Sequence, residues 1–265
     1  MTQNKQVRKN KKKLRVAFFD FACCEGCQIE FLNLGAEILS EFLNHFEVVE
    51  GREFTSDTAM AIDIALIEGS YTRKSDRQRL EDIRSRAHTV VAYGACATIG
   101  GINCLKNHQL DYKEYVYKDD ALFPCLESGP ALPISAIIKV DHYSHGCPLE
   151  KSELLQILYH LFHEKVPILH DYPVCMECKR RGTICRYEFK QHCLGVVARA
   201  GCGAPCPADG IPCEACRGFV DHPNLEALEK LLIERGQFSN ERAYQMTRMY
   251  NAAFRSDSVP WKEVI

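Results

Sequence analysis

Fifteen cysteines in a chain of 265 residues constrain this protein more than any other feature of its sequence. No apolar signal segment precedes the first of them, because the run Leu14–Phe21 is too short to serve as one. In a chain without a secretion signal, such cysteines act as metal ligands more often than as disulfides. The cysteine content therefore predicts a cytoplasmic metalloprotein.

The remaining composition excludes other classes of function. A hydrophobic content of 46% is sufficient for a globular core, and a net charge of −2 gives no support for nucleic-acid binding. No apolar run is long enough to span a membrane. The basic run Lys9–Lys13 closes a polar N-terminal segment, so we expect a disordered basic lead-in over residues 1–13.

The first part of the chain alternates apolar strands with helices, which is typical of a parallel sheet covered on both faces. Strands are predicted at Leu14–Asp20, from Val48–Val49, and at Ile62–Glu68, Thr89–Tyr93 and Ile134–Val140. Helices are predicted at Ile29–Phe42, Lys74–Arg86 and Leu149–Phe162. The expected fold class is α/β, with a flavodoxin-like domain over residues 14–165.

This alternation ends near Val166–Pro173. The segment Cys175–Cys216 is rich in Cys, Gly and Pro and lacks apolar periodicity, so something other than an apolar core must fold it. Two amphipathic helices are predicted after it, at Asn224–Arg235 and Asn240–Phe254. Residues 166–265 are therefore expected to form a small irregular metal-binding domain with short helices.

The cysteines of the first part follow predicted strands. Cys24 and Cys27 come after the first strand, Cys96 after the fourth and Cys147 after the fifth. Ligands of open parallel sheets bind at the carboxyl ends of the strands, so these four thiols are expected to meet there. The stretch Gly94–Gly101 superficially resembles a dinucleotide loop, but it lacks the Gly-x-Gly-x-x-Gly spacing and follows a late strand.

The second part holds eight cysteines, and thiolates in fours suit either tetrahedral zinc or a cubane iron–sulfur cluster. Their order suggests two groups, within Cys175–Cys193 and within Cys202–Cys216. A thioredoxin-type dithiol at the first pair would leave six later cysteines unexplained. We interpret Cys23, Cys104 and Cys125 as small buried apolar side chains, and His192 as a structural residue.

Three ordered cysteine motifs resemble the small subunits of nickel–iron hydrogenases. The proximal-cluster signature of that family is similar to Cys24-Glu-Gly-Cys27, Gly94-Ala-Cys96-Ala-Thr-Ile-Gly-Gly101 and Gly146-Cys147-Pro148. The medial-cluster region of its cytosolic group resembles the segment from Gly201 to Gly218, which contains Cys202, Cys206, Cys213 and Cys216. The distal-cluster ligands of that group are similar to Cys175, Cys178, Cys185 and Cys193.

This resemblance implies that the chain is the electron-transfer subunit of a soluble hydrogenase and that these twelve cysteines hold three [4Fe–4S] clusters. The proximal cluster would lie in the flavodoxin-like domain, and the other two would lie in the small iron–sulfur domain. The resemblance also implies that no catalytic residue lies in this chain, because hydrogen is activated at a nickel–iron centre in a separate large subunit. Electrons would pass to a flavin or iron–sulfur diaphorase. The terminal acceptor, which is chosen by other subunits, and the direction of the reaction stay open.

The sequence departs from the family pattern in three places. Membrane-bound or periplasmic small subunits use a His as one distal ligand and a three-iron medial cluster, whereas all eight positions here are Cys. The Gly-Cys-Pro motif continues with Leu149 instead of a second proline. The tandem Cys23–Cys24 is similar to the quinone-reductase subunit of respiratory complex I, which lacks the Cys-x-x-Cys pair and the eight-cysteine tail.

Two alternatives accompany this interpretation. A complex-I-like redox subunit without hydrogenase activity would differ in its partner, a large subunit without nickel ligands. A zinc-binding interaction protein would explain the eight-cysteine tail, but it would leave the cysteines at the strand ends unexplained.

Overall fold

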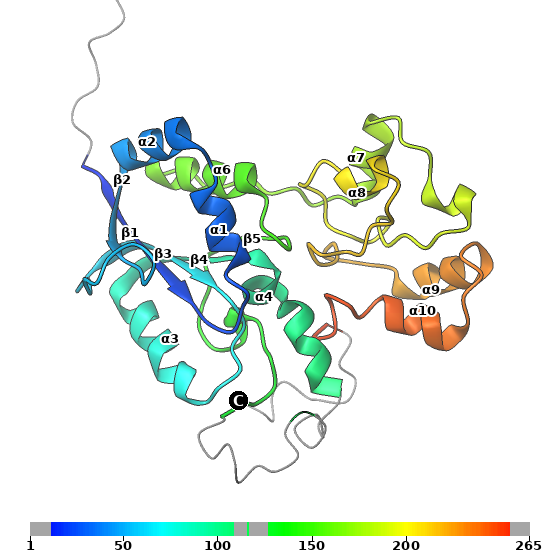
Figure 1. The fold of residues 1–265 in the computed structure, drawn as a ribbon, viewed down its shortest axis with the longest axis horizontal. Helices are drawn as coiled ribbons and strands as arrows, with labels where there is room; N and C mark the ends of the chain where they lie inside the picture. Colours follow the sequence, from blue (N-terminus) through cyan, green and yellow to red (C-terminus); the bar gives the residue numbers. More distant parts are fainter. Residues whose placement is uncertain (1–11, 109–115, 117–126, 255–265) are drawn as a thin grey trace, which may run out of the picture.

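The computed structural model describes residues 12–108, 116 and 127–254, which form a sheet region up to residue 165 and a cysteine-rich region from residue 166 (Figure 1). Most of the predicted basic lead-in, Cys125 and the last eleven residues lie outside this described part. Within it, no helix is both long enough and apolar enough to cross a membrane.

The sheet has five parallel strands in the order β2-β1-β3-β4-β5. Their bounds are Leu14–Asp20 (β1), Phe46–Glu50 (β2), Ile62–Glu68 (β3), Ala87–Tyr93 (β4) and His142–Ser144 (β5). This is the strand order of flavodoxin-like folds. The predicted α/β class is confirmed, because inner strands buried on both faces read as the nearly continuous apolar runs seen in the sequence.

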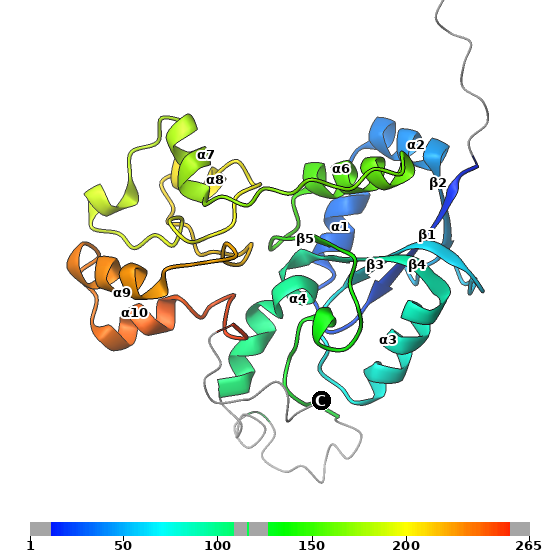
Figure 2. The ribbon, with the colours of Figure 1, turned by 180° about the vertical axis from the view of Figure 1, so that it is seen from behind.

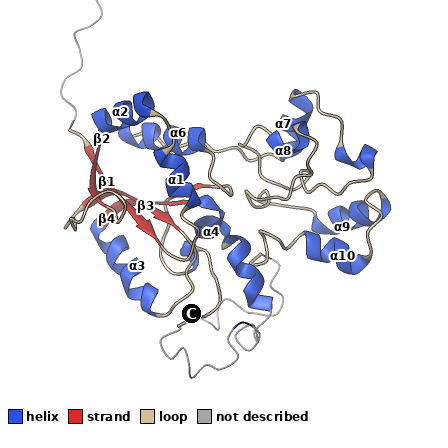
Figure 3. Cartoon of the chain, viewed as in Figure 1, coloured by secondary structure: helices blue, strands red, loops and turns tan. Residues whose placement is uncertain are grey.

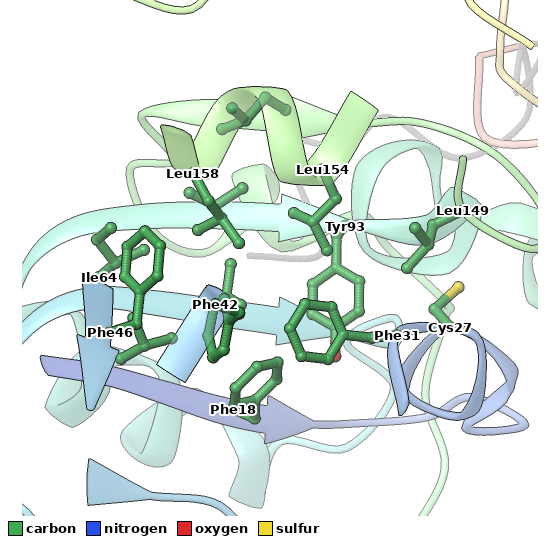
Figure 4. Packing of buried hydrophobic residues seen from close by; sticks show 14 of the residues in the cluster. Phe18, Cys27, Phe31, Phe42, Phe46, Ile64, Tyr93, Leu149, Leu154 and Leu158 are labelled. Atoms are coloured by element: carbon green, nitrogen blue, oxygen red, sulfur yellow. The ribbon is translucent and has the colours of Figure 1, made fainter. Parts of the chain in front are cut away.

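Helices cover both faces of the sheet (Figure 1). One face packs against α1 (Gly26–Leu32), α2 (Ala36–His45) and α6 (Lys151–Phe162). The other face packs against α3 (Ser75–Arg86), α4 (Gly94–Ile99) and the short helix η3 (Ile134–Ala136). Side chains alternate along each strand, so Phe18 belongs to the first core and Phe19 to the second (Figure 4 shows the first).

The predicted strand at Ile134–Val140 is wrong. Residues 134–136 form the 3-10 helix η3, and the fifth strand is the shorter β5. The backbone N–H of Ile138 donates to the carbonyl of Ile134, so both side chains reach the core from a coiled segment. An apolar run alone does not distinguish a buried strand from a buried turn.

The predicted helix at Ile29–Phe42 is two helices, because the chain turns at Gly35 with a φ of 87° between α1 and α2. The helices predicted at Lys74–Arg86, Leu149–Phe162 and Asn224–Arg235 are confirmed to within two residues. The last predicted helix is too long, since α10 (Asn240–Met246) ends eight residues before Phe254.

The cysteine-rich region consists mostly of loops and lies beside the sheet region in both ribbon views (Figures 2 and 3). Its helices are short: α7 (Val174–Arg180), η4 (Arg186–Phe189), α8 (Pro205–Ala208), α9 (Leu225–Glu234) and α10. A small core of Leu194, Phe219, Leu228 and Leu232 packs around two buried thiols, Cys193 and Cys213. The thiols are thus part of the packing that holds this region together.

A buried ion pair joins the two regions. Arg217, from the cysteine-rich region, pairs with Glu153 of α6, and their side chains are 3% and 7% exposed. Arg217 also donates to the carbonyl of His145 at 2.6 Å and to that of Ala200 at 2.8 Å. Glu153 accepts from the backbone N–H of His145 at 3.1 Å and from the hydroxyl of Ser144. Each charge is therefore satisfied on several sides.

We expect Arg217→Met to lower the free energy of unfolding by about 3–5 kcal/mol, because Glu153 is left buried without its partner. The double variant Arg217→Met/Glu153→Leu should recover most of this loss. Guanidinium unfolding of the full chain, purified without oxygen, measures both values. Arg199→Met is the matched control, because Arg199 pairs with two exposed aspartates and donates to the carbonyl of Phe219, so that its loss leaves no charge buried and should be about 1 kcal/mol. Equal losses for Arg217→Met and Arg199→Met would contradict a special role for the buried pair.

Candidate functional site

Four thiols predicted to meet at the carboxyl edge of the sheet do lie together there. Cys24 and Cys27 follow β1, Cys96 lies in α4 after β4, and Cys147 follows β5; we call them the first set. Burial raises the pKa of Cys96 to about 12, and the neighbouring thiols of Cys147 and Cys24 contribute to the rise. The backbone N–H of Ala95 donates to the carbonyl of Gly146 at 2.6 Å, which ties two of these loops together.

Gly94 allows the thiol of Cys27 to occupy its position. Figure 4 shows Cys27 projecting from α1 at the end of the first core. A Cβ atom on Gly94 would lie 2.6 Å from this sulfur, and the backbone at Gly94 has a φ of 78°. A side chain at position 94 would therefore collide with the Cys27 thiol and strain the turn after β4.

A carboxylate, that of Glu68, lies next to the four thiols of the first set. This carboxylate, at the end of β3, accepts the backbone N–H groups of Cys27 at 3.2 Å and Gln28 at 3.0 Å. Burial raises the pKa of Glu68, and these two hydrogen bonds partly offset the rise. Asn103 connects the loop after β1 to Cys96, because its amide donates to the carbonyl of Ala22 at 2.8 Å and contacts the sulfur of Cys96.

Four thiols of the cysteine-rich region line a single cavity of about 70 Å³. This second set consists of Cys175 and Cys178 from α7, Cys185 before η4, and Cys193 after it. Burial raises the pKa of Cys175 to about 11, with further contributions from the other three thiols. The grouping of these four cysteines, which their order in the sequence suggested, thus has a geometric counterpart.

The third set consists of Cys202, Cys206, Cys213 and Cys216. Burial raises the pKa of Cys216, with further contributions from Cys202 and Cys206. Burial also raises the pKa of Cys213, to which Cys216 and Cys202 add after Cys193. The third set therefore lies together and borders the second set at Cys193, whose sulfur accepts the backbone N–H of Cys213 at 3.4 Å.

The half-buried Glu177 and the buried Arg217 connect the three sets. Glu177, between the second-set ligand candidates of α7, accepts the N–H groups of Gly201 at 2.9 Å and Gly203 at 3.0 Å, on either side of Cys202. Arg217 follows Cys216 and binds the carbonyl of His145, two residues before Cys147. Gly201 is required here, because a Cβ on it would lie 2.5 Å from Arg217.

Four further residues of the site were not predicted from the sequence: Glu68, Asn103, Glu177 and Arg217. Only Glu68 carries a local signal, since it is an acidic residue that ends an apolar strand at the predicted site edge. The other three are ordinary polar residues whose partners are distant in sequence. No pattern in their own segments indicates those partners.

The remaining cysteines and His192 have identifiable surroundings. Cys104 is fully buried and its thiol donates to the carbonyl of Ala131, as expected of a small core side chain. Cys23 is half-buried, and burial raises its pKa to about 12, with Glu68 adding to the effect. The ring of His192 is hydrogen-bonded to Glu214. The fourteen cysteines within the described ranges are all free thiols.

No group of three His, Cys, Asp or Glu side chains in residues 12–108, 116 and 127–254 converges tightly enough to hold a single metal ion. The thiols of the second set instead surround a cavity. Such an arrangement has room for a cluster of several metal atoms.

Known proteins that resemble this chain include subunits of hydrogenases. The family of the 20 kDa subunit of NADH–ubiquinone oxidoreductase matches residues 24–161, a span that contains the whole first set. Sulfhydrogenase 2 subunit delta of Pyrococcus furiosus is 32% identical over 223 residues, which cover 83% of this chain and 93% of that protein. A vhu subunit of the F420-non-reducing hydrogenase from Methanocaldococcus jannaschii is 30% identical over 239 residues, covering 78% of this chain and 83% of the relative.

Among solved structures, the chain resembles a subunit of an NAD⁺-reducing [NiFe]-hydrogenase in the H2-reduced state. The match has a TM-score of 0.53 and 27% sequence identity, and it covers 60% of this chain and 96% of the other. The chain therefore belongs to the family of the 20 kDa subunit of NADH–ubiquinone oxidoreductase and is a homologue of hydrogenase small subunits.

Proposed function

We propose that this chain is the electron-transfer small subunit of a cytoplasmic nickel–iron hydrogenase and that it holds three [4Fe–4S] clusters. The single observation that carries the proposal is the grouping of twelve thiols into three sets of four. In this assignment, the first set binds the proximal cluster, the third set the medial cluster and the second set the distal cluster. The relatives that are named as hydrogenase subunits support the same role.

The residues fit cubane clusters better than zinc ions. Four thiolates around one zinc ion, with Zn–S bonds of about 2.3 Å, lie roughly 3.8 Å apart. No three His, Cys, Asp or Glu side chains within the described ranges converge in this way, and the second set lines a cavity of about 70 Å³. Thiolate ligands are the usual protein ligands of iron–sulfur clusters, which supply one-electron transfer when bound.

The residues of the chain position the thiols and shape their surroundings. Glu68 orients the start of α1 and hence Cys27, while Asn103 contacts Cys96. Because burial raises the pKa of Cys96 to about 12, this thiol is protonated at neutral pH in the metal-free chain. Ligation at Cys96 must therefore displace a proton, and the hydrogen bonds around the set tune the bound group.

The exposed side of the first set suits a large subunit with a nickel–iron centre. Cys24 and Cys147 are both exposed. Ile29 and Leu32, on α1 beside them, are 54% and 42% exposed, which is unusual for large apolar side chains next to a polar site. We place the large subunit on this face. A flavin or iron–sulfur diaphorase would then receive electrons beyond the second set, as the NAD⁺-reducing activity of the structural relative suggests.

Metal analysis tests this function directly. We expect the tagged chain, purified without oxygen from its own host, to carry about 12 iron and about 12 sulfide per copy in three four-iron clusters. A co-purifying partner centre should add about one nickel and its own iron. Inductively coupled plasma and acid-labile sulfide assays measure these values. Iron and sulfide without nickel would favour a complex-I-like subunit. Zinc without sulfide would overturn the proposed electron-transfer role.

Gly94→Ala should remove the proximal cluster alone, because the new methyl group would occupy the space of the Cys27 sulfur. We expect about one third of the iron to be lost while the two other clusters remain visible by electron paramagnetic resonance. Gly35→Ala is the matched control, since Gly35 also has a positive φ but nothing lies within 4 Å of its added Cβ. Iron content that falls equally in both variants would show backbone strain to be the cause.

A further inference from the structure

The segment Lys179–Lys190 forms a strongly basic surface around the second set of thiols. It contains Lys179, Arg180, Arg181, Arg186 and Lys190, against a single acidic residue, Glu188. Glu188 is paired with Arg235 at 3.0 Å. Of these basic residues, Arg186 is half-buried and the other four are exposed. This local charge contrasts with the chain as a whole, whose net charge is −2.

An open hollow of about 660 Å³ lies within this basic surface. Arg181, Arg186, Ile184 and Phe189 line it, together with Asp209. It adjoins the four-thiol cavity, because Thr183, Arg186 and Pro207 line both. A group that occupies the hollow therefore lies next to the second set, whose Cys185 is itself exposed.

The hollow combines apolar contact area with a rim of positive charge. Ile184 is 62% exposed and Phe189 is 53% exposed. The guanidinium of Arg186 lies 4.5 Å over the Phe189 ring, which holds that ring at the surface. Apolar centres with charged rims are typical of protein–protein interfaces, in which the charges set association rate and partner choice.

The surface lies at an end of the molecule away from the sheet (Figures 1 and 2). It therefore leaves the exposed face of the first set free for a different partner. One chain can thus bind two partners at once, one on the face beside the first set and one on the face beside the second set.

We propose that the surface formed by Lys179–Lys190 and its hollow docks an acidic electron-carrier protein, whose flavin or iron–sulfur group comes to rest beside the second set. This inference rests on the proposed function and names the chemistry of its partner. One electron passes per encounter, from the group held by the second set to that of the partner, and no covalent bond forms or breaks.

Zero-length cross-linking tests the docking. A carbodiimide joins lysine amines to carboxylates in direct contact, so the complete complex, purified without oxygen, is treated and its linked peptides are sequenced. We expect Lys179 and Lys190 to be joined to aspartates or glutamates of a subunit that binds flavin or iron–sulfur clusters. Cross-links to that subunit from Lys12 or Lys139, near the amino ends of β1 and β5, but from neither surface lysine, would overturn the proposal.

Charge reversal provides an independent readout. We expect Lys179→Glu/Arg180→Glu/Arg181→Glu to weaken retention of the electron-carrier subunit on the tagged chain at least tenfold at low salt. The difference should shrink at about 1 M salt, where the Debye length is about 3 Å. The triple variant Lys12→Glu/Lys13→Glu/Lys139→Glu is the matched control and should retain the carrier normally. Equal retention by the two triple variants would overturn the proposal.

The same samples separate failure of the docking from failure of the function. Iron, sulfide and nickel are measured in each variant, and preserved iron shows that the second set is intact. The milder Lys179→Gln/Arg181→Gln should show a smaller loss of retention if the triple variant loses iron. Nickel present with unchanged retention would overturn the docking alone, whereas absent nickel would overturn the proposed hydrogenase role whatever the cross-links show.

Discussion

The ion pair between Arg217 and Glu153 is the interaction on which the arrangement of the thiols depends. Its members come from segments 64 residues apart, and both are buried. Through Arg217 the cysteine-rich region is fixed to the carbonyl of His145, close to Cys147 of the first set. Because buried charges are costly unless fully paired, the two regions are held in one relative position by contacts that tolerate little adjustment.

The same network reaches the other thiols. The side chain of Arg217 passes so close to Gly201 that only glycine fits there, and Glu177 accepts the N–H groups on either side of Cys202. Glu177 lies on α7 between Cys175 and Cys178 of the second set. A short chain of polar contacts thus leads from the sheet edge into the cysteine-rich region, next to all three sets.

The two regions differ in what stabilises them, because their apolar cores differ in size. The sheet region has two large apolar cores and needs no metal to explain its packing. The cysteine-rich region has one small core, in which the buried thiols Cys193 and Cys213 take part. Small regions with limited cores gain stability from bound metal groups, so loading the thiols and folding this region are coupled in the proposed function.

The amino-acid sequence by itself determined the α/β class, four of the five strands and the thiols of each set, because apolar periodicity and cysteine spacing are local signals. It misplaced the strand at Ile134–Val140 and joined α1 to α2, because a buried coil and a glycine turn leave the apolar pattern almost unchanged. Only the tertiary structure decided the contacts of Glu68, Glu177 and Arg217. Their partners lie 17 to 72 residues away, and a hydrogen bond of that range leaves no periodic trace in the sequence.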